Sequence, residues 1–288
     1  MANKLRDLVG PGRLVSVMSA HNPLSARLAE LAGFDGIWAS GFELSAAYGV
    51  PDASLLSFTQ HLDMTRAIVE RVSVPVIADL DTGYGNAVNV MHVVGAYARA
   101  GAAAVVIEDK SFPKDTSLLA GGRQDLVRVE EFQGKIAAAR AAGSAHGLLV
   151  VARTEALIAD LGLEEALTRA RAYAEAGADM ILVHSKQKTP DEIIAFVRRW
   201  QGGTRLVVVP TAYPDLTEAK IRELGNIGIV IYGNHAVRAA VTAMRQVFAA
   251  IRADGGIHNV GKQIASVEEI FELQRVAEMK SVEQQYLR

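Results

Sequence analysis

Acidic and basic side chains follow several apolar segments of the sequence, where the strands of a parallel sheet would end. Asp79-Leu80-Asp81 comes after Val76-Ile77-Ala78, and Glu108 and Arg153 each end another apolar run. In an extended strand alternate side chains share a face, so we expect Asp79 and Asp81 to point toward one hard cation. Parallel barrels keep their chemistry at the carboxyl ends of strands. The pattern therefore predicts that these side chains meet in one mouth.

The predicted metal site consists of four carboxylates, Asp52, Asp79, Asp81 and Glu108. Any one of them alone has a plainer explanation as a helix cap or a solvated loop residue. Together in one mouth they would repel one another and raise their own pKa values unless a cation compensated. The chain has no cysteine, and no His-rich set lies nearby. An oxygen-preferring ion is therefore expected, Mg²⁺ first, with other divalent ions such as Mn²⁺ or Co²⁺ as alternatives.

Anion-binding groups are expected at the same mouth. Arg153 follows Leu148–Ala152, and its guanidinium there suits a carboxylate or a phosphoryl group, although a structural salt bridge is the simpler alternative. His184 ends Met180–Val183 in the same way, and a single histidine is often only a packed residue. Backbone N–H groups around Ser40-Gly41-Phe42 offer a further anion site.

These groups depend on strands that alternate with helical patterns, the order typical of repeated strand–helix units. The predicted strands are Leu14–Ser19, Gly36–Ala39, Val76–Leu80, Ala104–Glu108, Leu148–Arg153, Met180–His184, Leu206–Pro210 and Ile229–Tyr232. An open doubly wound sheet has the same local alternation. Eight strands without a Gly-rich dinucleotide fingerprint favour a closed (β/α)8 TIM-type barrel. Glycines after Ala-rich helices, at Gly33, Gly101 and Gly177, are predicted to turn the chain back toward the sheet.

The C-terminal part is predicted to add helices outside the eight units. One helix is expected from His235 to Ala253, and Ser266-Val267-Glu268-Glu269 resembles a capping box that opens another helix toward Leu287. Such an extension packs either on its own barrel or on a neighbouring copy. No linker-like segment divides the chain, so residues 1–288 are expected to form a single domain.

Composition restricts the partners. A net charge of −2 gives no electrostatic reason to expect nucleic acid or an anionic membrane. Disulfides and thiol catalysis are impossible without cysteine, and neither a signal peptide nor an apolar span appears in the sequence. A soluble protein of the cytoplasm is the expectation.

Four segments resemble the phosphoenolpyruvate mutase/isocitrate lyase superfamily. They are Trp38-Ala39-Ser40-Gly41, Asp79–Asn86, Glu108–Lys114 and Val151–Ala156, and the likeness extends from about Gly12 to Leu287. The resemblance implies an α/β barrel with a C-terminal helix swapped between subunits, and a homo-oligomer, dimeric or tetrameric. It also implies Mg²⁺-dependent chemistry on an α-keto acid or its enolate, with Trp38 among the residues near the substrate.

The loop after the fourth strand separates activities within that superfamily. Carbon–carbon lyases carry a catalytic cysteine there, and this chain has none. Mutases usually place asparagine where this sequence has Thr116, and the segment from Phe112 to Ser117 is similar to members that hydrolyse phosphonopyruvate. The resemblance thus implies hydrolysis of the C–P bond, with Asp79 binding Mg²⁺ directly.

In this interpretation Lys114 and Thr116 act from the loop above the phosphoryl group that Arg153 and His184 hold. Residues Lys110 to Gln124, with Gly121-Gly122 as a hinge, are expected to form a mobile lid. A phosphoenolpyruvate-forming mutase is the main alternative, since one loop residue can redirect the captured group. A carbon–carbon lyase and a non-catalytic barrel that binds a keto acid are the others.

Overall fold

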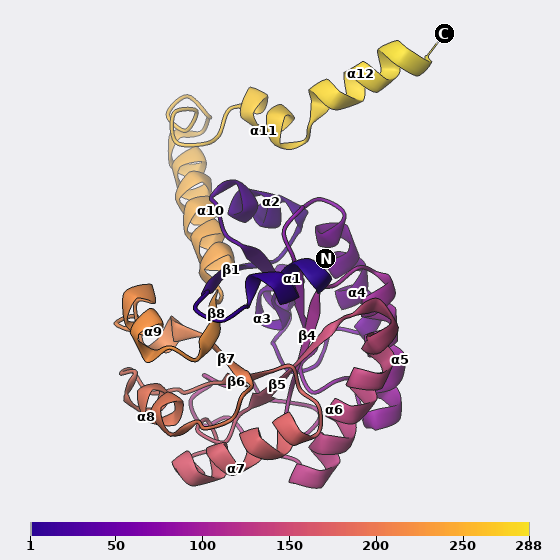
Figure 1. Cartoon of the computed structure of the whole chain (residues 1–288). Helices are drawn as coiled ribbons and strands as arrows, with labels where there is room; N and C mark the ends of the chain where they lie inside the picture. The colour runs from indigo at the N-terminus through magenta and orange to yellow at the C-terminus, as the bar shows by residue number, and fades with distance from the viewer. Residues whose placement is uncertain (1, 288) are drawn as a thin grey trace. The chain divides into compact units, whose positions relative to one another are not determined.

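Residues 2–287 are described by a computed structural model, in which eight parallel strands close into a barrel (Figure 1). Each strand pairs with the next in sequence, and the eighth pairs with the first. The strands are β1 (Val15–Ala20), β2 (Gly36–Ala39), β3 (Val76–Asp79), β4 (Ala104–Glu108), β5 (Leu149–Thr154), β6 (Met180–Val183), β7 (Arg205–Val208) and β8 (Ile227–Tyr232). The predicted TIM-type barrel is confirmed, and each strand lies within two residues of its predicted bounds at either end.

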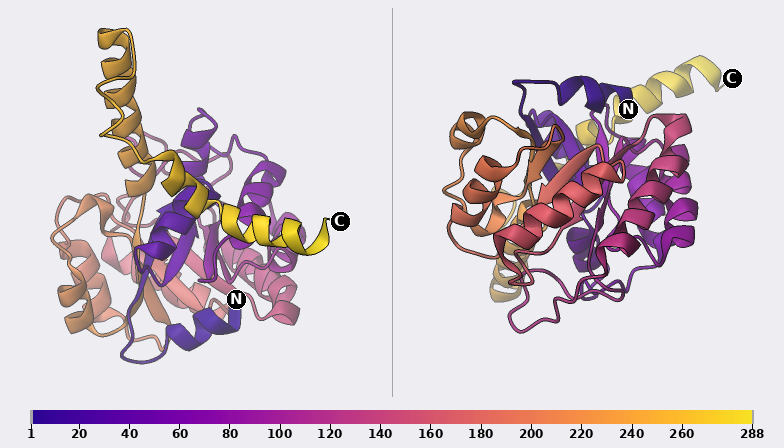
Figure 2. Two further views of the ribbon diagram at one scale, coloured as in Figure 1. Left: turned by 90° about the horizontal axis from the view of Figure 1, so that it is seen from above. Right: turned by 60° about the horizontal axis from the view of Figure 1, so that its bottom comes forward.

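Helices follow the strands and form the outer layer that Figure 2 shows from two further directions. They are α2 (Pro23–Leu31), α3 (Gly41–Ala47), α4 (Phe58–Val69), α5 (Ala87–Arg99), α6 (Val129–Gly143), α7 (Gly162–Glu175), α8 (Asp191–Arg199) and α9 (Glu218–Leu224), whereas α1 (Ala2–Leu8) precedes the first strand. Leu5 of α1 is fully buried among side chains from inside the barrel. The first helix therefore covers the end of the barrel where the strands begin.

Alternation along the strands separates two hydrophobic layers. In β5, Leu149 and Val151 belong to the cluster inside the barrel, whereas Val150 and Ala152 pack between the strands and the surrounding helices. This is the twofold side-chain period of a strand with both faces buried. The strands are thus fixed on two sides, which gives the residues at their carboxyl ends a rigid base.

Glycine closes three of the helix-to-strand connections as the sequence predicts. Gly33, Gly101 and Gly177 have φ angles of 89°, 88° and 102°. Side chains with a Cβ avoid this left-handed region, so glycine permits the chain to turn at once toward the next strand.

The chain separates into two compact units, one up to Ala236 and one from Val237 onward. The C-terminal unit contains most of α10 (His235–Asp254), together with α11 (Val267–Leu273) and α12 (Val276–Tyr286). Ser266 caps α11 by accepting a hydrogen bond from Glu269 N at 3.1 Å, as predicted, but Arg275 at φ 58° interrupts the single helix that we expected. A single domain over residues 1–288 stays a prediction. Within residues 2–287 no helix is long and apolar enough to cross a bilayer.

Candidate active site

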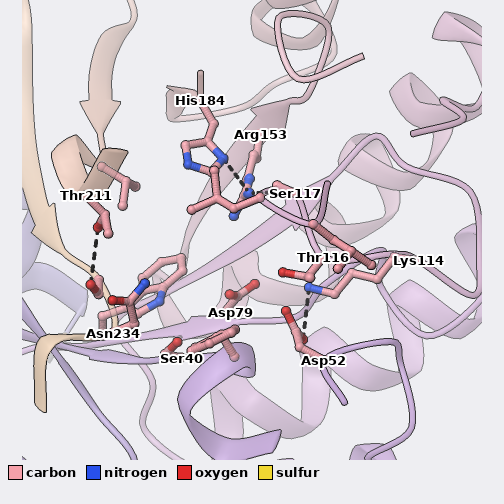
Figure 3. A pocket seen from close by; sticks show the side chains of 16 residues that line it. Ser40, Asp52, Asp79, Lys114, Thr116, Ser117, Arg153, His184, Thr211 and Asn234 are labelled. Atoms are coloured by element: carbon pink, nitrogen blue, oxygen red, sulfur yellow. Dashed lines mark hydrogen bonds and ion pairs between the residues drawn. The ribbon is translucent and has the colours of Figure 1, made fainter. Parts of the chain in front are cut away.

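The carboxyl ends of the strands surround a pocket of about 310 Å³ in the barrel unit (Figure 3). Nine of the predicted site residues line it, namely Trp38, Ser40, Phe42, Asp52, Asp79, Lys114, Thr116, Arg153 and His184. Gly41, Asp81 and Glu108 are not among the lining residues, but Asp81 and Glu108 lie within 4 Å of the lining residue Lys114. The strand-end argument therefore brings the predicted groups into one place.

Asp79 and Asp81 come together by a different route from the one we predicted. The strand ends at Asp79, and Asp81 has a φ of 50°, so the two side chains do not alternate along one extended strand. Instead the chain turns, and Asp81 N donates a hydrogen bond to Asp79 Oδ1 at 3.2 Å. A Cβ added to Gly41 would lie 2.8 Å from Asp81 Oδ1 and 3.5 Å from Asp79 Oδ2. Glycine at position 41 thus leaves the space that both carboxylates occupy.

The Lys114 ammonium lies among the acidic side chains. Its Nζ is 2.6 Å from Asp81 Oδ1, 3.3 Å from Asp52 Oδ1 and 3.8 Å from Glu108 Oε1. Burial alone would lower the pKa of Lys114, but these three carboxylates outweigh burial and hold that pKa well above its usual value. The side chain is therefore charged and takes the place of a counter-cation.

Burial raises the pKa values of Asp79 and Asp81, and the neighbouring carboxylates raise them further against the opposing charge of Lys114. The oxygens that accept no hydrogen bond within the described chain include Asp52 Oδ1, Asp81 Oδ1 and both of Glu108. Lys114 supplies one positive charge to three of these carboxylates, and a hydrated divalent cation would supply the further charge and donors that such a set needs. The residues present fit a Mg²⁺ site in donor type, although residues 2–287 hold no group of three acidic or histidine side chains already arranged around one point.

Arg153 and His184 form the opposite wall, as Figure 3 shows. Arg153 Nη2 lies 2.9 Å from His184 Nδ1. The guanidinium keeps its protons, so Nδ1 accepts and the neutral ring carries its proton on Nε2. Burial, and then the Arg153 charge, lower the pKa of His184, which fits a neutral ring. A longer contact of 3.4 Å from Nδ1 to Glu155 Oε1 is consistent with this assignment, because it is too long to require a proton on Nδ1.

The loop between β4 and α6 brings Lys114 and Thr116 over the pocket. Its base is closed by an antiparallel bridge between Lys110 and Leu126. The Thr116 carbonyl accepts hydrogen bonds within the loop, whereas the Thr116 hydroxyl has no partner among the residues that the structure describes. Gly121, in the predicted hinge, has a φ of 73°. Movement of the loop as a lid stays a prediction.

Sequence reasoning missed two groups of residues. Four lie where β7 and β8 end and line the pocket, namely Val209, Thr211, Gly233 and Asn234. The strand-end rule points to them, but their side chains do not titrate and drew no attention. The other group is Lys110, Ser117 and Glu155, which lie within the quoted segments but were given no role; Ser117 and Glu155 contact Arg153, and Lys110 contacts these two. Glu155 stands two residues after Arg153, which was the available signal.

Comparison with known proteins agrees with this geometry. The family model of phosphoenolpyruvate phosphomutase matches residues 5–252. The chain is 63% identical over 284 residues to the phosphonopyruvate hydrolase of Variovorax sp. (strain Pal2), an alignment that covers 99% of this chain and 98% of that protein.

Two crystal structures are similar over the whole chain. A phosphonopyruvate hydrolase in complex with oxalate and Mg²⁺ superposes with a TM-score of 0.95 at 61% identity, covering 100% of this chain and 99% of that one. The phosphoenolpyruvate phosphomutase from Streptomyces platensis subsp. rosaceus superposes with a TM-score of 0.96 at 47% identity and the same coverage. The superfamily expected from the sequence is thus confirmed, and the chain belongs to the phosphoenolpyruvate phosphomutase family.

Proposed function

We propose that this protein hydrolyses the carbon–phosphorus bond of 3-phosphonopyruvate to give pyruvate and phosphate. The observation that carries the proposal is the Thr116 hydroxyl, which lines the pocket without a partner in the described chain. A free hydroxyl can donate to one group and accept from another, so it suits the orientation of an attacking water. The likeness to the Variovorax phosphonopyruvate hydrolase supports the same activity.

The pocket offers separate sites for the two ends of this substrate. Arg153 and His184 hold the phosphoryl group from one wall, and the backbone at Ser40-Gly41-Phe42 receives the carboxylate, with Trp38 packed beside it. Asp79 would bind Mg²⁺ directly, with Asp52, Asp81 and Glu108 around its waters. The bound ion would neutralise the developing enolate oxygen as a Lewis acid. The structure containing oxalate and Mg²⁺ supports this choice of ion.

In the reaction a water oxygen forms a bond to phosphorus as the C–P bond breaks. The electron pair of that bond goes to the former methylene carbon as the enolate of pyruvate, which takes a proton from solvent. The water gives up one proton to solvent, which balances the proton taken up by carbon, and its oxygen leaves with the other proton as part of hydrogen phosphate. Phosphoryl transfer passes mainly through a loose transition state, so the residues act by position and charge. Thr116 orients the water, and the buried positive charge of Lys114 lies at the same side of the pocket.

Phosphorus NMR of the purified protein with phosphonopyruvate and Mg²⁺ tests the proposal directly. Inorganic phosphate as the product supports hydrolysis. Phosphoenolpyruvate as the product would replace it with the mutase activity, in which the enolate oxygen captures the phosphoryl group in place of water. If the substrate stays unchanged at every Mg²⁺ concentration, the protein has neither the hydrolase nor the mutase activity. The similarity to the Streptomyces platensis mutase makes formation of phosphoenolpyruvate the main competing outcome.

The proposal includes a homo-oligomer, dimeric or tetrameric, that works in the cytoplasm. The C-terminal unit exposes large apolar side chains on α10, α11 and α12, including Phe248, Phe271, Val282 and Tyr286. Exposed apolar side chains that recur along helices suit burial against another copy of the chain. Light scattering coupled to size exclusion would give the mass, and a monomer at micromolar concentration would contradict this part of the proposal.

A further inference from the structure

Three buried polar side chains lie directly behind Arg153 and belong to no substrate or metal site. Lys110, Ser117 and Glu155 expose 1%, 8% and 0% of their surface. Lys110 and Ser117 come from the loop after β4, whereas Glu155 directly follows β5. The three side chains therefore join the loop to the strand that positions Arg153.

The Ser117 hydroxyl is the centre of this group. Its Oγ accepts hydrogen bonds from Lys110 Nζ at 3.0 Å and from Arg153 Nη2 at 2.9 Å, and it donates one to Glu155 Oε2. A hydroxyl has one proton and two lone pairs, so these bonds use its full capacity. Although Ser117 lines the pocket, its hydroxyl has no bond left for a substrate.

Glu155 fixes the guanidinium from the other side. Its Oε1 accepts from Arg153 Nε at 2.6 Å, and its Oε2 lies 3.4 Å from Lys110 Nζ. The Glu155 backbone is itself held, because Glu155 N donates to Asp109 Oδ1 at 2.9 Å. Burial alone would raise the pKa of Glu155, but the charge of Arg153, supported by that of Lys110, outweighs burial and holds that pKa well below its usual value. The carboxylate is therefore charged when it orients Arg153.

This arrangement uses three of the five N–H donors of the Arg153 guanidinium. Nε and Nη2 bond Glu155, Ser117 and His184, whereas Nη1 has no hydrogen-bond partner in the part of the chain that the structure describes. Nε and Nη2 of the guanidinium are thus held by the protein, and the N–H groups of Nη1 remain available to an anion. Within the loop, Lys110 Nζ also donates to the Asp115 carbonyl at 2.7 Å, which joins the base of the loop to the segment that carries Lys114 and Thr116.

We propose that Lys110, Ser117 and Glu155 are positioning residues that lock the loop after β4 to the Arg153 guanidinium. The loop that carries Lys114 and Thr116 is then held down by the same bonds that orient the phosphoryl-binding arginine. When one of these hydrogen bonds is lost, the loop opens and, at the same time, the Arg153 guanidinium is no longer held in one orientation. This inference rests on the proposed function for its effect on turnover, but the locking itself is a property of the protein alone.

The test compares Ser117→Ala, Glu155→Gln and Lys110→Met with the full-length wild type. A matched control is Glu164→Gln, which breaks an exposed ion pair between Glu164 on α7 and Arg199 on α8. Tryptic cleavage after the buried Lys114, located by mass spectrometry, reports loop opening in the presence of Mg²⁺ and oxalate. Since hydrogen bonds to charged groups are broken, cleavage should be about ten to a hundred times faster in the three variants and unchanged in the control.

Further readouts separate positioning from a general loss of structure. Ser117→Thr keeps the hydroxyl and should restore slow cleavage, and the unfolding midpoint of Ser117→Ala should stay close to that of the control. Because the three residues act as a unit, Ser117→Ala combined with Glu155→Gln should cleave no more than about threefold faster than the worse single variant. With phosphonopyruvate, kcat should fall in Ser117→Ala more than KM rises.

Two results would overturn the inference. One is cleavage at the control rate in both Ser117→Ala and Glu155→Gln, and the other is effects that multiply in the double variant. Ser117→Ala removes one oxygen and no charge. If Glu155→Gln does not fold, the cleavage rate of Ser117→Ala alone therefore tests the inference. If the wild type releases no phosphate, the proposed function fails while cleavage and calorimetric oxalate affinity still test the lock.

Discussion

The two walls of the pocket satisfy their charges in opposite ways. Around Lys114, Asp81 Oδ1 and both oxygens of Glu108 accept no hydrogen bond within the described chain, although the Lys114 ammonium lies within ion-pair distance. Around Arg153, the Ser117 hydroxyl uses its full bonding capacity and both oxygens of Glu155 have a donor. One wall has spare acceptors and the other has none.

This difference shows how one pocket can bind and release a cation at one wall and bind an anion in a fixed orientation at the other. Buried carboxylates that outnumber their cationic partners destabilise a fold, and a further cation that binds them reverses the effect. Hydrogen bonds already made to Arg153 fix its direction before any ligand arrives, which lowers the cost of orientation in the reaction. Glu108 belongs to both walls, since its oxygens lie 3.8 Å from Lys114 Nζ and 3.4 Å from Arg153 Nε.

The largest effect is expected at the acidic wall. Asp79→Ala should abolish phosphate release, by about a thousandfold or more, because it removes the proposed direct metal contact. The fold should persist, since burial already disfavours the charge of Asp79. Turnover at saturating Mg²⁺ and the unfolding midpoint check this, with the exposed Asp63→Ala as control.

Asp52→Ala sharpens the same prediction. Its proposed contact to the ion passes through water, so it should mainly raise the Mg²⁺ concentration needed for activity. Full activity of Asp79→Ala at high Mg²⁺ would show that the acidic wall does not bind the catalytic ion through this residue.

A second expected effect follows from the close approach at Gly41. The Cβ of Gly41→Ala would meet Asp81 Oδ1 at 2.8 Å, so the two aspartates must move. Displacement of catalytic groups by about 1 Å costs on the order of a hundredfold in kcat/KM. Gly134→Ala in α6 is the control, because a Cβ there meets no atom within 4 Å. Equal kcat/KM in the two variants would mean that the acidic wall tolerates displacement.

Much of the barrel could be predicted because its signals are local. Apolar runs marked all eight strands, and the rule that chemistry gathers at their carboxyl ends placed Arg153, His184 and Asp79 on one pocket. The turn at Asp81 escaped, since nothing in Asp79-Leu80-Asp81 signals a φ of 50° there. The break at Arg275 escaped for the same reason.

The contacts that tie the loop to the barrel could not be predicted. Ser117 and Glu155 are 38 residues apart, and their hydrogen bond depends on how the loop folds over β5. Periodicity gives the face of a strand but not the path of an irregular loop. The position of Lys114 among three carboxylates depends on that path too, so the charged residues could be named in advance but their pairing could not.

A buried histidine behind the acidic wall allows a comparison by pH. Burial, followed by the charge of Lys114, lowers the pKa of His61 to about 4, and its Nε2 has no hydrogen-bond partner in the described chain. The unfolded chain therefore takes up this proton first as the pH falls from about 6.5. Over the window down to pH 4, His61 should remove about 3 kcal/mol of the free energy of unfolding.

The variant His61→Gln should flatten that pH dependence, as measured by urea unfolding between pH 7 and pH 4. A matched comparison is His92→Gln, because the ring of His92 packs near Phe58 and His92 is exposed. If wild type and His61→Gln lose stability in parallel over this window, the acid sensitivity comes from other groups.

The smallest expected effect concerns the side chain at position 116 and separates hydrolysis from isomerisation. The free hydroxyl of Thr116 suits the orientation of water, whereas asparagine would hold the phosphoryl group through its amide and help to exclude water. Thr116→Asn should lower phosphate release by about tenfold, a change of roughly 1.4 kcal/mol, and lower oxalate affinity much less. Phosphoenolpyruvate should become detectable by phosphorus NMR.

Thr116→Ala completes this comparison, because it removes the hydroxyl without offering an amide. Phosphate release should fall as in Thr116→Asn, but no phosphoenolpyruvate should form. Ser117→Ala is the neighbouring control, since its hydroxyl is bonded to Lys110, Arg153 and Glu155 and should alter rate without altering the product. Full hydrolysis in both Thr116 variants would mean that water is oriented by the opposite wall, and the choice between the two activities would then depend on Arg153 and His184.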